Sequence, residues 1–231
     1  GAASVAGFEL VGRCATCGAV GGDYFDFVPM ANGRTLALVA DVSGHNLASG
    51  MVMVGARAAL RVIAGTTTAP ATVFDGLAAA IHDDLARTER FITAAALAIT
   101  PDERIVEFVG AGHPDALVLR ADDGRVERLA SANCMLGFLP GVTHRAEPVR
   151  LEAGDLVLLY TDGIVEAADA SGELFGEARL VEVLRAQRGS SASVVLDAVF
   201  GAIDRFCGDG VHPADDLTVL VLRSRREGES R

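Results

Sequence analysis

The sequence predicts an α+β fold built largely of antiparallel sheet. Segments with strand character and segments with helical periodicity come in groups: strands, two helices, many strands, two helices and a final strand. A parallel α/β fold would alternate the two. Half of the 231 residues are hydrophobic, which is enough for a sizeable buried core. Because no Pro/Ser-rich linker divides the chain, we expect one domain over residues 1–223 and a flexible tail over residues 224–231.

The first half of the chain contains two predicted strands and two predicted helices. Residues 8–13 and 35–42 are rich in apolar and β-branched residues, which is typical of strands. From Leu47 to about Gly65, apolar residues recur at spacings of three and four, which predicts a helix. This stripe consists of Leu47, Met51, Val54, Ala58 and Val62. The same spacing predicts a second helix over residues 72–88, with Pro70 near its start.

The second half changes to the pattern of short strands. Four short apolar runs separated by turn-forming residues predict an antiparallel meander. They cover residues 91–100, 104–112, 115–120 and 125–129. Residues 149–160 predict a further hairpin around the turn at residues 153–155. Helical periodicity returns at residues 176–187 and 191–207, and residues 216–223 predict a closing strand.

The charge and hydropathy of the chain exclude several classes of function. The formal net charge is −11 and the basic residues are spread along the chain, so we expect no nucleic-acid partner. All 20 basic residues are Arg, which excludes a Lys-dependent phosphate-binding loop and Schiff-base chemistry. No uninterrupted apolar run approaches roughly 18 residues and no signal peptide opens the chain. We therefore expect a cytoplasmic protein without a membrane segment.

Four cysteines offer one candidate motif, the CxxC pair of Cys14 and Cys17. A closed zinc site needs four ligands, usually as two paired motifs, and the chain has one such pair. A thioredoxin-like site needs the pair at the start of a helix after a strand, whereas Gly-Ala-Val-Gly-Gly follows here. We interpret the cysteines as buried or half-buried thiols without a functional role.

Carboxylates form the more informative pattern. The stretches GGDYFD, ADVSGHN, YTDGI and ADDLT each place Asp at or beside a strand end, next to Gly or another acid. They supply Asp23, Asp26, Asp41, Asp162, Asp215 and Asp216. A turn or a cap explains any one of them alone. Together they would repel one another unless a cation holds them, and oxygen ligands select Mg²⁺ or Mn²⁺ over zinc. A pair of such ions can bind a phosphoryl group.

Five motifs in this order carry a family resemblance: GGDYFDF, DVSGHN, GAGHP, LYTDGIVEA and DDLTVLVL. They resemble the bacterial metal-dependent serine/threonine phosphatases of the stage II sporulation protein E type, a branch of the type 2C protein phosphatase superfamily. The resemblance covers about residues 7–223. It implies a two-layered antiparallel β-sandwich flanked by helix pairs. It also implies an enzyme in which two Mn²⁺ or Mg²⁺ ions activate a water against phosphoserine or phosphothreonine.

The resemblance implies a role for each matching residue. Asp41 would be shared between both ions, and the backbone carbonyl of Val42 would complete the coordination shell of one of them. Asp162 and Asp215 would bind the second ion, and Asp23 would hold water bound to the first ion. Asp41 and Asp162 would therefore act in catalysis through the metal-activated water. The supporting positions would be Asp26, Gly44, His45 and Asp216.

Two positions depart from the family pattern. Asn46 stands where family members usually have Gly, and Gly110 stands where they often have Asn. Both changes are expected to alter loop geometry without removing a proposed ligand. In the animal-type enzymes a His just after the shared Asp is a candidate general acid. Here Ser43 fills that place and His45 lies two residues further on. The residue that donates a proton to the leaving group is therefore unassigned. His113 is interpreted as structural.

The resemblance also suggests the biological setting. The substrate would be a phosphorylated anti-sigma-factor antagonist, a small protein of partner-switching signalling that regulates a sigma factor. Family members often carry upstream sensory or receiver domains, so we expect one outside this chain, and a homodimer is left open. The alternative is a catalytically weak or inactive scaffold of the same fold that binds a partner protein. A metal-dependent phosphodiesterase or nuclease is a third hypothesis, which the acidic charge disfavours.

Overall fold

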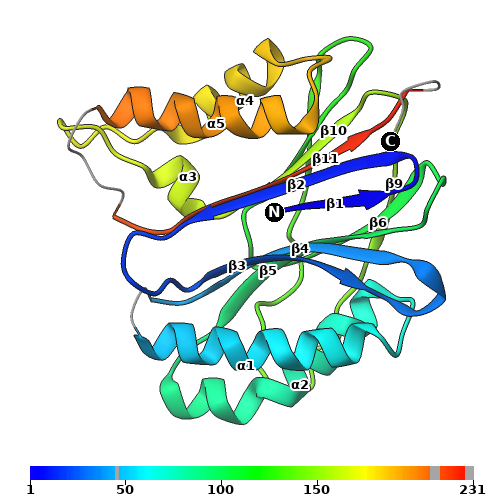
Figure 1. Ribbon diagram of the computed structural model, residues 1–231. Coiled ribbons are helices and arrows are strands. Elements are labelled where there is room, and N and C mark those ends of the chain that lie inside the picture. The colour runs from blue at the N-terminus through cyan, green and yellow to red at the C-terminus, as the bar shows by residue number, and fades with distance from the viewer. Residues whose placement is uncertain (45–46, 209–213, 227–231) are drawn as a thin grey trace.

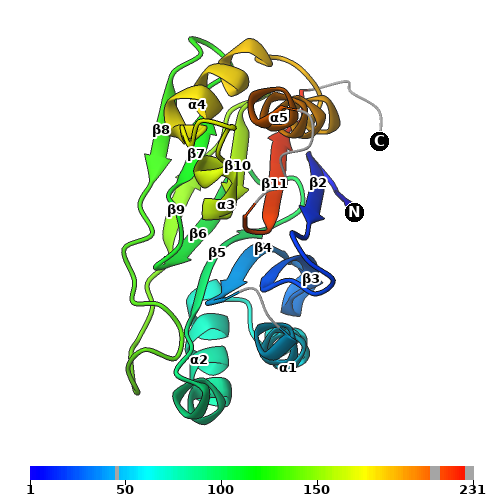
Figure 2. The same cartoon turned by 90° about the vertical axis from the view of Figure 1, so that its left-hand side faces the viewer.

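The protein is described by a computed structural model over residues 1–44, 47–208 and 214–226. Two antiparallel sheets lie face to face, and helices cover the outer face of each (Figure 1). Turned by 90°, the same four layers run from α5 through the two sheets to α1 and α2 (Figure 2). This arrangement confirms the predicted α+β class and the two-layered sandwich between helix pairs.

The first sheet has five strands in the order β3-β4-β5-β6-β9. They are β3 (Asp23–Pro29), β4 (Thr35–Val42), β5 (Ile92–Ile99), β6 (Ile105–Ala111) and β9 (Glu147–Arg150). Helices α1 (Leu47–Ala64) and α2 (Pro70–Thr88) cover its outer face. Because side chains alternate along a strand, Leu38 of β4 packs toward these helices and Val39 toward the other sheet.

The second sheet has six strands in the order β1-β2-β11-β10-β7-β8. They are β1 (Ala2–Val5), β2 (Phe8–Ala15), β7 (Ala116–Leu119), β8 (Val126–Leu129), β10 (Leu156–Tyr160) and β11 (Leu217–Ser224). The helices on its outer face are α3 (Asp162–Glu166), α4 (Gly176–Ala186) and α5 (Ala192–Cys207). Ser191 caps α5 by accepting a hydrogen bond from the backbone N–H of Val194. The prediction did not include β1, β3 or the short α3.

The predicted hairpin over residues 149–160 is wrong. β9 pairs with β6 in the five-stranded sheet, whereas β10 pairs with β7 and β11 in the six-stranded sheet. The turn at Gly154 therefore carries the chain from one layer to the other. The predicted meander is divided in the same way, since β5 pairs with β6 in one sheet and β7 with β8 in the other. Alternation of apolar residues identifies strands but does not say which sheet receives them.

The closing strand is longer than predicted. Ser224 is fully buried at the end of β11, where it pairs with Phe8. The neighbouring Arg223 forms an ion pair with Glu9 at 2.8 Å, and the N–H of Arg225 donates to the carbonyl of Gly7. The predicted tail therefore begins too early, because these polar residues are paired within the sheet. Residues 227–231 of that tail lie outside the described residues.

Helix α1 presents an unexpected face to the core. The stripe that predicts the helix is exposed, and four of its residues have 66–72% of their surface accessible. They are Leu47, Met51, Val54 and Val62. The face that packs on the sheet carries Met53, Ala56, Leu60 and Ala64. Among the described helices, α1 alone is long and apolar enough to cross a membrane, a property that core helices of soluble proteins share.

Candidate metal centre

The predicted ligands come together at one end of the sandwich, where both sheets contribute. Asp23 begins β3, and Asp41 lies one residue before the end of β4 in the same sheet. Asp162 begins α3 two residues after β10, and Asp215 lies two residues before β11. Asp41 shares the inward face of β4 with Val39, a residue of the core between the two sheets. The carboxylates thus border the space between the ends of the sheets.

Asp23 and Asp41 lie directly opposite each other on β3 and β4. Residues paired in this way have Cβ atoms about 5 Å apart, and like charges at such positions destabilise the sheet. Burial raises the pKa of Asp41 to about 7, and the negative charges of Asp162 and Asp215 contribute to this increase. Burial likewise raises the pKa of Asp23 to about 8, although a hydrogen bond from Thr161 opposes the shift.

The raised pKa values of these two carboxyls, caused mainly by burial, predict the pH dependence of the metal-free protein. A carboxyl whose pKa is higher in the folded than in the unfolded chain binds more protons when folded, so stability falls as pH rises between the two values. Here the window runs from the ordinary value of 3.8 to about 7 for Asp41 and about 8 for Asp23. Urea denaturation in EDTA should therefore give a lower free energy of unfolding at pH 8 than at pH 5. A higher free energy of unfolding at pH 8 would contradict the raised pKa values of Asp41 and Asp23.

Thr161 connects Asp23 to the opposite sheet. Its hydroxyl donates to Asp23 Oδ2 at 2.7 Å and accepts the backbone N–H of Thr218 at 3.1 Å. Thr161 is fully buried, and it immediately precedes Asp162. One residue therefore ties a proposed ligand of the five-stranded sheet to the strands that position the ligands of the other. The sequence analysis missed this role, although the order Tyr-Thr-Asp-Gly after a buried strand contains the signal.

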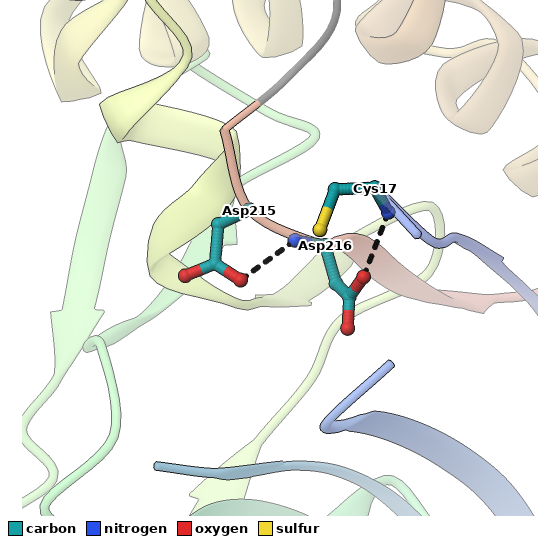
Figure 3. A group of neighbouring side chains, drawn as sticks. All are labelled: Cys17, Asp215 and Asp216. Atoms are coloured by element: carbon teal, nitrogen blue, oxygen red, sulfur yellow. Dashed lines mark hydrogen bonds between the residues drawn. The ribbon is translucent and has the colours of Figure 1, made fainter. Parts of the chain in front are cut away.

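Asp216 holds backbone groups. Its side chain is buried, and its two oxygens accept three N–H groups, two from the loop between β2 and β3 and one from the first residue of β3. The donors are Cys17 at 2.8 Å, Gly22 at 2.8 Å and Asp23 at 3.3 Å. Figure 3 shows the bond from Cys17 to the Asp216 carboxylate. These three bonds fix the loop that leads to Asp23.

Two glycines allow the loops to approach closely. A Cβ on Gly22 would lie 2.6 Å from the carbonyl oxygen of Val42 and 3.2 Å from Asp41 Oδ1. The proposed carbonyl ligand therefore packs against the backbone of Gly22, where a side chain would not fit. Gly44 has a φ of 88°, in the left-handed region that favours glycine. A Cβ there would lie 2.7 Å from Arg90 Nη1. Glycine at position 44 therefore lets this loop turn beside Arg90.

The sequence profile of the Stage II sporulation protein E (SpoIIE) family matches residues 31–225. The chain belongs to this family. It is 24% identical over 204 residues to the phosphoserine phosphatase RsbU of Bacillus subtilis, a match that covers 88% of this chain and 59% of RsbU. It is 25% identical over 233 residues to the protein IcfG of Synechocystis, a match that covers 88% of this chain and 36% of IcfG. The chain thus spans about one third to three fifths of these relatives.

Solved structures of PP2C phosphatase domains share the fold. The SiaA-PP2C domain of Pseudomonas aeruginosa matches with a TM-score of 0.81 and 23% identity, covering 93% of this chain and 85% of that domain. The PP2C phosphatase domain of SpoIIE from Bacillus subtilis matches with a TM-score of 0.79 and 18% identity, covering 95% and 64%. The chain therefore has the fold of the type 2C protein phosphatases, a metal-dependent family.

The donor atoms fit the metals that the SpoIIE family implies. The proposed ligands are carboxylates and one backbone carbonyl, which are hard oxygen donors suited to Mg²⁺ or Mn²⁺. Burial raises the pKa of Asp41 and of Asp162, and the negative charge of Asp215 raises both further. A divalent cation would offset this repulsion. Asp215 is exposed, so the centre opens to solvent on that side.

Cys17 lies beside this centre. Among the described residues, one group of three metal-ligating side chains has ligand atoms within 4.8 Å of one another, formed by Cys17, Asp215 and Asp216 (Figure 3). Both oxygens of Asp216 already accept backbone N–H groups, which leaves few lone pairs for an ion. Cys14 and Cys17 are half-buried free thiols, as interpreted from the sequence, but the position of Cys17 beside Asp215 was not foreseen.

Asp26 lies apart from the other carboxylates, which corrects the prediction that it supports the metal centre. Side chains three residues apart on a strand point to opposite faces, so Asp26 points toward α1 while Asp23 points between the sheets. Its oxygens accept two hydrogen bonds from Arg61 of α1, both at 2.8 Å, and a third from the Tyr24 hydroxyl. Asp26 therefore attaches α1 to the sheet.

Replacement of Asp26 by Asn should separate this role from catalysis. The bidentate bond with Arg61 is partly exposed, so we expect a loss of about 1–2 kcal/mol in the free energy of unfolding. Phosphatase activity and Mn²⁺ affinity at a temperature where the variant is fully folded should stay within twofold of wild type. Denaturant unfolding and isothermal titration calorimetry measure the two effects. A tenfold loss of Mn²⁺ affinity would return Asp26 to the metal centre.

The motifs contain two histidines, His45 and His113, and the structure describes only the second. His45, predicted as a supporting residue, lies outside the described residues, as does Asn46. His113 is buried, and burial lowers its pKa to about 3, so it stays neutral. Its Nδ1 lies 2.9 Å from the hydroxyl of Thr93, the residue paired with Asp41. This geometry agrees with the structural role interpreted for His113.

Gly110, the second departure from the family pattern, is also accounted for. A Cβ at this position would overlap the hydroxyl of Ser131, so an Asn side chain would not fit beside it. The side-chain amide of Asn133 donates to the Gly110 carbonyl at 2.9 Å. Ser131 in turn accepts the backbone N–H of His113 at 3.1 Å. The local packing of this loop therefore favours glycine.

Proposed function

We propose that the chain is a metal-dependent protein phosphatase that hydrolyses phosphoserine or phosphothreonine. The observation that carries the proposal is the placement of Asp41, which is opposite Asp23 and within the electrostatic influence of Asp162 and Asp215. Such a concentration of partly buried carboxylates is costly without bound cations. Membership of the SpoIIE family and the type 2C fold support the same function.

The resemblance to the SpoIIE family implies which residues would hold two Mn²⁺ or Mg²⁺ ions, and the arrangement of the carboxylates supports this assignment. Asp41 would be shared between the ions, Asp162 and Asp215 would bind one, and the Val42 carbonyl and a water held by Asp23 would complete the other. When bound, the ions would supply an activated water and neutralise the charge of the phosphoryl group. Such neutralisation is required because a chain with a net charge of −11 otherwise repels a phosphorylated substrate.

The chain's own residues would provide a preorganised site. Thr161 orients the Asp23 carboxylate by its hydrogen bond, and Gly22 lets the Val42 carbonyl lie close to the neighbouring loop. Groups held in place before the reaction need no reorganisation when the phosphoryl charge develops. The exposed position of Asp215 would give a protein-borne phosphate access to the centre.

The proposed substrate is a phosphorylated anti-sigma-factor antagonist. Two relatives from Bacillus subtilis, RsbU and RsbP, are named phosphoserine phosphatases, which supports phosphoserine as the substrate class. Family members often carry upstream sensory or receiver domains, so such a domain belongs to the proposal, as does a homodimer. We propose that the chain forms one catalytic domain, which includes β11 to its end at Ser224, and that it acts in the cytoplasm.

Hydrolysis of p-nitrophenyl phosphate tests this function. We expect release of p-nitrophenol with Mn²⁺ or Mg²⁺, none in EDTA, and a loss of at least about 10²-fold in Asp162→Asn. Asp83→Asn, an exposed position on α2, is the matched control and should keep wild-type activity. A phosphoserine peptide should be hydrolysed with the same metal dependence. Mn²⁺ binding without hydrolysis of either substrate would instead favour the inactive scaffold.

A further inference from the structure

We propose that Asp216 is the positioning residue that joins the two halves of the metal centre, and that it is not itself a metal ligand. The inference rests on the proposed function and deepens it. One half of the centre comes from β3 and β4 in the five-stranded sheet, and the other from α3 and the segment before β11. Asp216 contacts the stretches that carry ligands from both halves.

The side chain of Asp216 reaches toward the five-stranded sheet. It accepts the N–H groups of Gly22 and Asp23, which fixes the start of β3 and hence the Asp23 carboxylate. The third donor, Cys17, lies at the other end of the same loop. A carboxylate that accepts several backbone N–H groups forms charge-assisted bonds, which are the stronger class of hydrogen bond. The loop is therefore held at both ends by one residue.

The backbone of Asp216 reaches the other half of the centre. Its N–H donates to Asp215 Oδ1 at 2.8 Å, which orients the carboxylate of a proposed ligand (Figure 3). Its carbonyl oxygen occupies the space that a Cβ on Gly163 would need. Gly163 follows Asp162 directly, so the chain at this ligand packs against Asp216. One buried residue therefore contacts the stretches that carry Asp23, Asp215 and Asp162.

The alternative is that Asp216 binds an ion together with Cys17 and Asp215, because their ligand atoms lie within 4.8 Å of one another. Each oxygen of Asp216 already accepts a backbone N–H at 2.8 Å, so an ion would have to share these oxygens with the N–H donors. Sharing would weaken charge-assisted bonds that fix the loop. The observed hydrogen bonds therefore favour the positioning role.

Two variants separate position from charge. Asp216→Asn keeps the shape but removes the charge and replaces one acceptor oxygen with a donor amide. Gly21→Ala leaves Asp216 intact, but its Cβ would overlap Asp216 Oδ2 and push the loop away. Asp155→Asn is the matched control. Asp155 is also buried and accepts backbone N–H groups from Ala121 and Glu152, but it lies in the turn between β9 and β10.

The experiment measures Mn²⁺ binding by titration calorimetry and backbone amide exchange by NMR in the metal-free protein. In Asp216→Asn and Gly21→Ala we expect Mn²⁺ affinity to fall at least tenfold and the amides of Gly22 and Asp23 to exchange at least tenfold faster. Asp155→Asn should change neither quantity by more than twofold, although its melting temperature should fall. A merely structural role for Asp216 predicts that its variants behave like Asp155→Asn.

The outcomes distinguish this inference from the proposed function. If the wild type binds Mn²⁺ and both site variants bind it within twofold of wild type, Asp216 does not position the centre and the inference is overturned. The same holds if Asp216→Asn loses affinity while Gly21→Ala does not, because the effect is then one of charge. If the wild type itself binds no Mn²⁺, the proposed function fails and the inference fails with it. Gly21→Ala keeps the test available should Asp216→Asn not fold.

Discussion

Replacement of Asp41 by Asn is expected to abolish phosphatase turnover while making the metal-free protein more stable. Asp41 is the carboxylate proposed to be shared by both ions, so its loss should reduce kcat by about 10³-fold, the upper end of what one preorganised electrostatic group contributes. In the metal-free protein the same change removes a partly buried charge that lies opposite Asp23. The Asn side chain keeps the shape and removes the repulsion.

Two measurements check this prediction. Turnover is assayed with saturating Mn²⁺, and the melting temperature is measured in EDTA at pH 8, where wild-type Asp41 with a pKa of about 7 is mostly ionised. We expect the variant to melt above wild type at pH 8 and close to wild type at pH 5. Turnover within tenfold of wild type would remove Asp41 from the centre. A melting temperature below wild type at pH 8 would contradict the proposed repulsion.

Replacement of Gly22 by Ala is expected to have the second largest effect. The added Cβ would lie 2.6 Å from the Val42 carbonyl and 3.0 Å from that of Gly44, so one of the two loops must move. Overpacking of this kind costs about 1–3 kcal/mol of stability. A displacement of about 1 Å at a reacting centre lowers the rate by about 10²-fold. We therefore expect a 10²-fold loss in kcat/KM together with weaker Mn²⁺ binding.

Gly55→Ala is the matched control for this variant. Gly55 lies on the exposed side of α1, and a Cβ there would meet no atom within 4 Å. Because alanine favours the helix, the control should gain about 0.5–1 kcal/mol in stability and keep wild-type activity. A Gly22→Ala variant that binds Mn²⁺ and turns over like this control would show that the Val42 carbonyl tolerates displacement.

The sequence predicted the elements of the fold better than their pairing. Helical spacing located α1, α2, α4 and α5, because each has a regular apolar face. The sequence predicted a hairpin around Gly154, but the turn joins strands of two different sheets. The residues of a turn do not show whether the next strand pairs with the previous one or joins the other sheet. The stripe on α1 has helical spacing but faces solvent, because the small residues Ala56 and Ala64 allow close packing on the opposite face.

The candidate ligands could be predicted because motifs carry them. Asp23, Asp41, Asp162 and Asp215 each lie at or within two residues of a strand end, and the structure brings them to the same end of the sandwich. Their supports could not be predicted. Thr161 and Asp216 act through bonds to residues more than 100 positions away along the chain. Asp26 resembled a ligand by motif, yet strand alternation turns it toward α1.

The most direct test of the metal centre is crystallography of the protein grown with Mn²⁺, with data collected at the manganese absorption edge. The account predicts two anomalous peaks, both next to the Asp41 carboxylate and about 3.5–4 Å apart, as in other two-metal sites. Asp162 and Asp215 should contact one peak, and Asp216 should contact neither. A single peak between Cys17, Asp215 and Asp216, or no peak beside Asp41, would contradict the account.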